Sequence, residues 1–178
     1  MKYIDAFNHF FPKRLWDKML TLEGAGQNIG KRMRNVPCIF DLDVRMRIMD
    51  EFGPDYRQIL SLGMPPLESL GNPELTEELA KLGNDGLADL VMRHPERFAG
   101  FVASLPMNSD NAASEAERAF VECGANGLQI HSNINGAPLD EERFFPVFEV
   151  AAKHGKPVLL HPARGSNMPD YLTEDKSR

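Results

Sequence analysis

The sequence predicts an α/β fold in which parallel strands are joined by right-handed helical crossovers. Two observations support this prediction. Short apolar runs typical of buried strands alternate along the chain with longer segments whose apolar residues recur at helical spacing. The 178 residues, 42% of them hydrophobic and 26% charged, also suffice for one substantial core. We therefore expect residues 1–178 to form a single domain.

The first predicted strand covers residues 2–7, which are rich in Tyr, Ile and Phe and are followed by the interruptions Asn8 and Pro12. A helix over residues 15–22 comes next. Residues 23–37 combine Gly, Arg and Pro without a clear period, which indicates a long loop.

Apolar residues at helical spacing over residues 43–52, followed by a Gly-Pro stop, predict the next helix. Residues 58–62 form the second strand, and a loop rich in glycine and proline spans residues 63–73. Leucines then recur at helical spacing from residue 75 to a stop before Pro95, which indicates a long helix.

The last part of the chain repeats the alternation. Residues 98–104 form the third strand, and a helix with a face of small alanines runs from about residue 109 to Glu122. Residues 127–130 form the fourth strand, residues 139–154 a helix, and residues 157–160 the fifth strand. The pattern therefore predicts five parallel strands with four intervening crossovers.

Composition excludes several classes of protein. A net charge of −6 gives no overall electrostatic reason to bind nucleic acid or an anionic membrane. No apolar run approaches the ~20 residues of a membrane span, and Asp5 stands where a secretory signal would be apolar, so we expect a cytoplasmic protein. Cys38 and Cys123 lack CxxC spacing, and we interpret them as buried free thiols rather than a zinc site.

Three of the five histidines follow predicted strands. Ligands of parallel α/β proteins bind at the carboxyl ends of the strands, where His9, His131 and His161 are placed. His94 and His154 instead lie near predicted helix C-termini, where a histidine cation is favoured by the helix dipole, and we interpret both as structural. The first three histidines are therefore the candidate site.

Residues 4–12, which read Ile-Asp-Ala-Phe-Asn-His-Phe-Phe-Pro, resemble the first-strand motif of the amidohydrolase superfamily. The similar branch contains aminocarboxymuconate-semialdehyde decarboxylase and related metal-dependent decarboxylases of aromatic acids. Four further blocks resemble this branch in the same order: residues 43–50, 94–98, 124–130 and 158–162. The resemblance implies a (β/α)8 TIM barrel. Because such a barrel takes about 250 residues, this chain corresponds to its N-terminal part.

The resemblance also implies a divalent metal, zinc in the first place and manganese in the second. The family pattern has a His-x-His or Glu-x-His pair of ligands in the first strand, but Phe7 stands at the first of these positions and has no lone pair to donate. His9 and the fifth-strand His161 carry over as ligands. His131 is the nearest spare donor, either a substituted ligand or a substrate contact. Asp5, Phe7 and His9 alternate along the strand and are expected to face the barrel interior.

The family's further ligand and its catalytic histidine belong to later strands, so no catalytic residue is assigned and weak metal affinity is expected. Arg32, Arg34 and Arg164 are loop arginines that could clamp a substrate carboxylate with two hydrogen bonds. Arg45 and Arg47 lie on a predicted helix and are interpreted as ordinary solvated residues.

Three functions follow as hypotheses. The first is a metal-dependent carbon–carbon lyase that decarboxylates a small aromatic or unsaturated carboxylic acid. The second is hydrolysis of a lactone or ester by metal-activated water. The third is a non-catalytic truncated barrel that acts by association. Exposed edges on the first and fifth strands favour pairing with another copy, so a homo-oligomer is expected.

Overall fold

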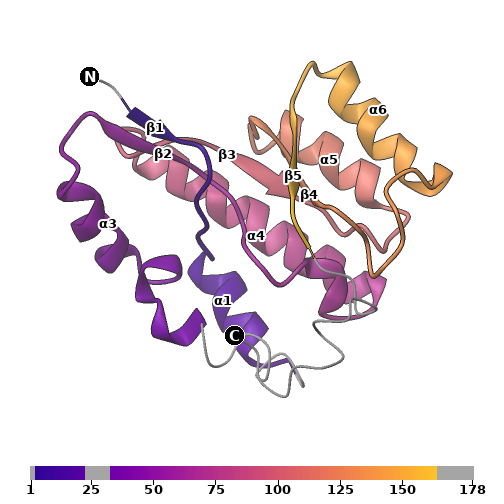
Figure 1. The fold of residues 1–178 in the computed structure, drawn as a ribbon, viewed down its shortest axis with the longest axis horizontal. Coiled ribbons are helices and arrows are strands. Elements are labelled where there is room, and N and C mark those ends of the chain that lie inside the picture. The colour runs from indigo at the N-terminus through magenta and orange to yellow at the C-terminus, as the bar shows by residue number, and fades with distance from the viewer. Residues whose placement is uncertain (1–2, 23–32, 164–178) are drawn as a thin grey trace.

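The computed structural model describes residues 3–22 and 33–163 (Figure 1). Five strands form one sheet in the order in which they occur along the chain. They are β1 (Tyr3–Asp5), β2 (Tyr56–Leu60), β3 (Phe98–Ser104), β4 (Gly127–His131) and β5 (Val158–His161). Every neighbouring pair is parallel, which confirms the predicted α/β class.

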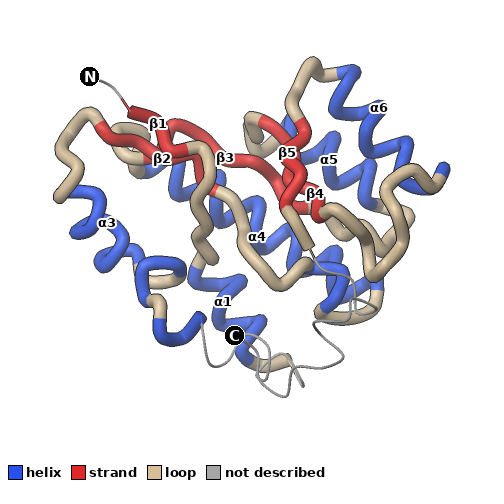
Figure 2. Tube along the Cα trace, in the orientation of Figure 1, coloured by secondary structure: helices blue, strands red, loops and turns tan. Residues whose placement is uncertain are grey.

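Helices occupy all four connections between the strands. The α-helices are α1 (Lys13–Leu20), α3 (Leu42–Asp50), α4 (Pro73–Arg93), α5 (Ala112–Val121) and α6 (Phe145–Lys153). Short 3-10 turns are η1 (Met33–Asn35), η2 (Pro37–Ile39), η3 (Leu67–Ser69) and η4 (Glu142–Phe144). Figure 2 shows α4 passing behind β3, and α4 also packs against α1 and α5. The predicted crossovers are therefore confirmed.

The first strand is shorter than predicted, and local hydrogen bonds explain why. The Asp5 carboxylate accepts the backbone N–H of Phe7 at 3.0 Å, and the Asn8 side chain donates to the Asp5 carbonyl at 3.0 Å. Such side-chain bonds give the backbone partners that a continued strand would otherwise supply. The chain therefore leaves the sheet after Asp5.

Side-chain caps set two helix starts. The Asp41 side chain accepts the N–H of Val44 at the start of α3. Asn72 accepts the N–H of Leu75 ahead of Pro73, so α4 begins two residues before the predicted position. After the C-terminal end of α5, Gly124 has a φ of 72°, a conformation that favours glycine after a helix.

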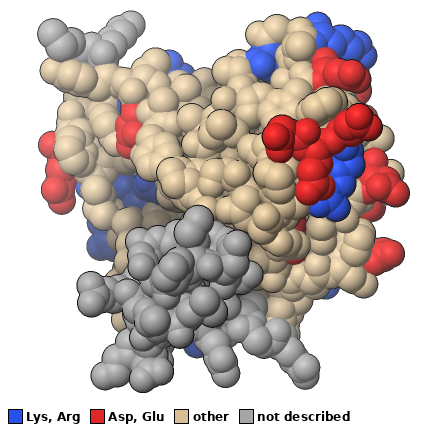
Figure 3. Space-filling model, turned by 45° about the vertical axis from the view of Figure 1, so that its right-hand side comes forward, with Lys and Arg blue, Asp and Glu red and all other residues tan. Residues whose placement is uncertain are grey.

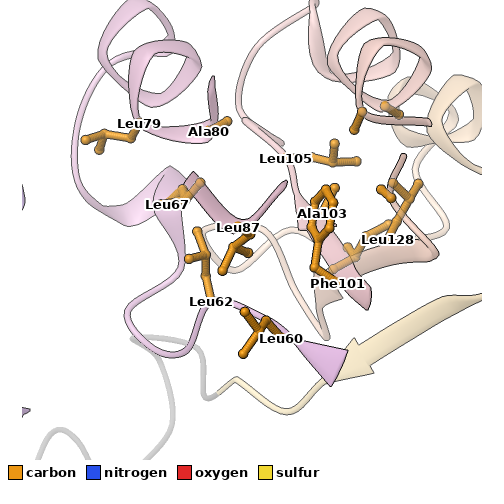
Figure 4. Close-up of a cluster of buried hydrophobic side chains, with 14 of the residues drawn as sticks. Leu60, Leu62, Leu67, Leu79, Ala80, Leu87, Phe101, Ala103, Leu105 and Leu128 are labelled. Carbon is orange, nitrogen blue, oxygen red and sulfur yellow. The ribbon is translucent and has the colours of Figure 1, made fainter. Parts of the chain in front are cut away.

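The hydrophobic core lies between the sheet and its helices (Figure 4). Leu60, Phe101 and Leu128 project from three successive strands and are at most 1% exposed. They belong to the same core cluster as the fully buried Leu79 and Leu87 of α4. Burying a side chain of this size stabilises the fold by roughly 1.5–3 kcal/mol. This packing holds the carboxyl ends of the strands in fixed relative positions.

The sheet is strongly curved. Four spacings of about 4.8 Å would place β1 and β5 about 19 Å apart in a flat sheet. Yet the imidazole of His9, four residues after β1, lies 3.2 Å from that of His161 at the end of β5. The strands therefore curl toward each other and form half of a barrel.

Hydrophobic residues are exposed at both edges of this half barrel. Tyr3, Ile4 and Leu160 each have an exposed fraction of 56%. No helix among the described residues is long and apolar enough to cross a membrane. Charged side chains of both signs gather at the right of the view in Figure 3, whereas the middle of that face is largely uncharged. Cys38 and Cys123 are free, but they are partly exposed rather than buried as predicted.

Candidate metal centre

The structure brings the three strand-end histidines together. His131 and His161 end β4 and β5 and are paired in register, with ring centroids 5.1 Å apart. The rings of His9 and His161 have centroids 5.0 Å apart, and their Nε2 atoms are separated by 3.2 Å. His94 and His154 lie at the C-terminal caps of α4 and α6, as predicted.

Ser61 fixes the orientation of His9. Its hydroxyl donates to the Asn8 carbonyl at 2.6 Å and lies 2.9 Å from His9 Nδ1. Because the only hydroxyl hydrogen is used on the carbonyl, the network assigns the proton of neutral His9 to Nδ1. A Cβ at Gly63 would lie 3.0 Å from His9 Cγ, so glycine leaves the space that the ring occupies. The Nε2 of neutral His9 therefore carries a lone pair.

His161 has the same arrangement. Its Nδ1 lies 2.9 Å from the carbonyl of Pro162, which can only accept, so the proton of neutral His161 is also on Nδ1. Two lone pairs then meet across 3.2 Å, an unfavourable contact unless a cation lies between them. Two nitrogens bound to one zinc ion at ~2.0–2.1 Å in tetrahedral geometry would be about 3.3 Å apart. The pair therefore fits a shared divalent metal.

Burial keeps the imidazoles of His9 and His131 neutral at pH 7. Burial, with smaller contributions from the nearby His161 and Arg45, lowers the pKa of His9 to about 4. Burial likewise lowers the pKa of His131 to about 4, with smaller effects from His161 and His9. Neutral imidazole is the form that binds metals. At neutral pH the nitrogens of His9 and His131 are therefore not blocked by an added proton.

Phe7 covers one side of the histidine pair. Its ring lies edge-on to His9, with centroids 5.3 Å apart, and stacks on His161 at 5.7 Å. This contact places Phe7 on the same side as His9, as the alternation predicts, although β1 has already ended. Within the residues that the structure describes, no three His, Cys, Asp or Glu side chains are arranged to hold a metal. His9 and His161 thus form a close pair, and the phenyl ring of Phe7 lies against both of them.

Arg45 is buried, so its interpretation as a solvated residue was wrong. It is 7% exposed and donates to Gln58 Oε1 at 3.1 Å and to the backbone carbonyl of His9. Gln58 continues the chain of hydrogen bonds to Tyr56, whose hydroxyl donates to Asp5. Arg45 precedes the fully buried Met49 by one helical turn, a spacing that could have revealed its position. Arg47, by contrast, is exposed as predicted.

The arginine clamp stays a prediction. Arg32 and Arg164 lie outside the described residues, and Arg34 is exposed on η1. Sequence reasoning assigned no role to Ser132 and Asn133, but both side chains donate to the Ala163 carbonyl, at 3.1 and 2.8 Å. They tie the segment after His161 to the end of β4. A run of Ser and Asn is typical of any turn, so only the structure could identify this contact.

Glu68 is a second residue that sequence reasoning missed. It lies on η3, within the predicted loop of residues 63–73, yet it is only 4% exposed. Burial raises the pKa of its carboxyl group to about 7. The single acidic residue in a Gly- and Pro-rich loop gives no sequence signal for burial, because the cover comes from distant strands.

Glu68 makes stability depend on pH. The folded pKa is about 7 and the ordinary value is 4.5, so the folded state binds more protons between these limits. We expect the contribution of Glu68 to the free energy of unfolding to be highest below pH 4.5. This contribution should fall by up to about 3 kcal/mol as pH rises to 7. Urea unfolding at several pH values should show this loss, and Glu68→Gln should remove it. An unchanged pH profile in the variant would contradict the assignment.

A family model described as amidohydrolase matches residues 4–175. The chain therefore belongs to the amidohydrolase family. Its relatives place it in the decarboxylase branch of the superfamily. The chain is 31% identical over 188 residues to 2-amino-3-carboxymuconate-6-semialdehyde decarboxylase of Dictyostelium discoideum, covering 94% of this chain and 52% of the relative. It is 36% identical over 127 residues to gamma-resorcylate decarboxylase of a Polaromonas species, covering 67% and 38%.

Solved structures agree with this placement. The structure of 5-carboxyvanillate decarboxylase from Novosphingobium aromaticivorans, complexed with manganese and 4-hydroxy-3-methoxy-5-nitrobenzoic acid, has a TM-score of 0.79 at 26% identity, covering 96% of this chain and 53% of that chain. Dihydroxybenzoic acid decarboxylase from Polaromonas, with bound manganese, has a TM-score of 0.72 at 28% identity, covering 95% and 51%. The chain thus spans about half the length of these relatives, which confirms the predicted partial barrel.

Proposed function

We propose that this chain supplies the histidine pair of a divalent-metal centre in a decarboxylase that acts on a small aromatic or unsaturated carboxylic acid. The observation that supports this most directly is the 3.2 Å separation of the His9 and His161 Nε2 atoms, each with its Nδ1 proton held by an acceptor. The named activities of the relatives supply the reaction class. Manganese becomes the first choice of metal because two similar structures hold it, ahead of the zinc that we first expected.

The residues have distinct tasks in this proposal. His9 and His161 would hold the metal, which when bound supplies Lewis acidity toward a carboxylate and a neighbouring oxygen. Ser61 keeps His9 in the tautomer that leaves Nε2 free. Arg45 fixes the His9 backbone carbonyl from α3. Such supporting bonds orient ligands, and their loss typically weakens metal binding 10–100-fold. His131, beside His161, would contact the substrate or serve as a further ligand.

The Phe7 ring lies beside the same histidine pair. Its exposed fraction is 57%, so it presents an apolar surface beside the histidine pair. A planar aromatic acid could stack on this ring while its carboxylate faces the metal. Apolar walls with a few convergent polar groups are typical of sites for small molecules. The arrangement therefore favours an aromatic substrate over a lactone or ester.

Metal binding tests the proposal. The purified chain should take up Mn²⁺ or Zn²⁺ in equilibrium dialysis, and His9→Ala or His161→Ala should weaken uptake at least ~10-fold, as expected for loss of a ligand. His154→Ala is the matched control, because its imidazole pairs with Glu117 on α5. Uptake that stays below ~0.1 equivalent at millimolar metal, or that falls equally in the control, would favour the alternative of a non-catalytic barrel that acts by association.

Activity distinguishes the two enzymatic alternatives. Release of carbon dioxide from an aromatic acid such as 2,6-dihydroxybenzoate, the compound bound to one similar decarboxylase, would support the lyase. Hydrolysis of lactones or esters without release of carbon dioxide would support the hydrolase. The cytoplasmic location and the homo-oligomer stay predictions, and the exposed edge strands are what favours self-association.

A further inference from the structure

A small buried cavity lies beneath the β2–α4 connection, at the carboxyl ends of β3 and β4. Apolar side chains and backbone form most of its wall: Leu62, Gly63, Pro65, Leu67, Leu105, Met107 and Ile130. Its polar lining residues are Glu68, Ser104, Gln129 and His131, which are only 2–7% exposed. The cavity is therefore a polar space inside the core and is not a surface groove.

Each of these four side chains has a buried atom without a hydrogen-bond partner. The atoms are Glu68 Oε1, Ser104 Oγ, Gln129 Oε1 and His131 Nε2. The described part of the chain has seven such side-chain atoms, and more than half of them belong to this one cavity. Buried polar atoms are nearly always paired in folded proteins. Their concentration at one place therefore points to a ligand that bonds to all four.

The chemistry of the four atoms defines that ligand. Gln129 Nε2 already donates to the Leu62 carbonyl at 2.5 Å, so its Oε1 can only accept. Ionised Glu68 is likewise an acceptor. Ser104 Oγ and His131 Nε2 can each donate. The complement of two acceptors and two donors is one molecule with two O–H donors and two lone pairs.

We propose that this cavity is a binding site for a single water molecule that joins Glu68 on η3 to His131 on β4. The water would donate to Glu68 and Gln129 and accept from Ser104 and His131. Buried waters in proteins typically make about three such bonds and occupy polar cavities of this kind. The cavity volume of about 10 Å³ is that needed by one water molecule, so a larger ligand does not fit. This inference does not depend on the metal centre.

The site assigns a role to each nitrogen of His131. Its Nε2 is committed to the cavity, so only Nδ1 is available to a substrate or metal on the side of His161. Glu68, acting through the water, is then a positioning residue for His131. Water-mediated bonds are nearly as favourable as direct ones and can hold a ring in one tautomer.

A spectroscopic experiment tests this role. We expect ¹H–¹⁵N spectra of the ¹⁵N-labelled, metal-free chain at pH 8 to show His131 protonated on Nε2, with cross-relaxation from water to that proton. Glu68→Met should shift the His131 ring nitrogens, whereas Ser109→Ala should not, because the Ser109 hydroxyl bonds Glu77 outside the cavity. A His131 spectrum that is the same in wild type and Glu68→Met would overturn the proposal.

A double-mutant cycle provides a second test that needs no assignment of spectra. If Glu68 and Ser104 share one water, the effects of Glu68→Met and Ser104→Ala on the unfolding equilibrium constant should not be independent. We expect the double variant to differ from the product of the single effects by about fivefold or more, as for residues that share a partner. In the control cycle of Glu68→Met with Ser109→Ala, the double variant should equal the product of the single effects. Independent effects in both cycles would show that the cavity holds no shared ligand.

Discussion

Replacing Phe7 with histidine is expected to tighten binding of Mn²⁺ or Zn²⁺ at least tenfold. The ring already lies beside both His9 and His161, with centroids 5.3 and 5.7 Å away. An imidazole in the same place would add a third nitrogen donor to a pair that now offers two. Catalytic zinc sites generally use three protein ligands, which is why two histidines alone should bind weakly.

Isothermal titration of the metal into each variant measures this gain. Phe7→Leu is the matched control, because it removes the ring without adding a donor, and it should bind as weakly as wild type. The gain should disappear when His161→Ala is combined with Phe7→His. If Phe7→His and Phe7→Leu bind metal equally well, the ring does not occupy the position of a ligand, and the proposed centre fails.

Arg45→Ala should lower the free energy of unfolding by about 3 kcal/mol. The substitution takes a donor from Gln58 Oε1 and another from the His9 carbonyl, and it removes the guanidinium from the face of Phe10, 5.5 Å away. Buried acceptors that lose a partner cost about 1–3 kcal/mol each. Relief of the buried charge offsets part of this loss, since burial already lowers the pKa of Arg45.

Urea unfolding checks the size of this effect. Arg47→Ala lies two residues along the same helix, where the side chain is exposed, and it should change stability by less than about 0.5 kcal/mol. Metal affinity should also fall in Arg45→Ala, because the backbone of His9 loses its support from α3. Equal stability of the two arginine variants would show that the buried network contributes nothing.

Periodicity predicted the architecture well, because each strand and helix is determined mainly by its own residues. All five strands and most helices lie within three residues of their expected positions, but α6 begins at Phe145, six residues after the predicted start. The errors occur where a distant residue decides the outcome. The burial of Arg45 depends on Gln58 and on the backbone of His9, and the burial of Glu68 depends on β3 and β4. The sequence of one segment does not reveal which distant residues will pack against it.

The candidate site could be predicted from the sequence only in part. Strand ends indicated His9, His131 and His161, and the resemblance supplied the metal. The close approach of His9 and His161 could not be derived from either segment, because it arises from the curvature of the whole sheet. The water site was missed entirely, since its four polar groups come from segments that look like an ordinary loop and ordinary strands.

The contact between His9 and His161 joins residues 152 positions apart, whereas each strand pairs with the next one along the chain. During translation the sheet can therefore grow one strand at a time as the nascent chain leaves the ribosome, because each new strand pairs with the one before it. The contact between His9 and His161 can form only after β5 has been synthesised, because His161 ends that strand. The proposed metal centre can consequently form only after β5 has joined the sheet.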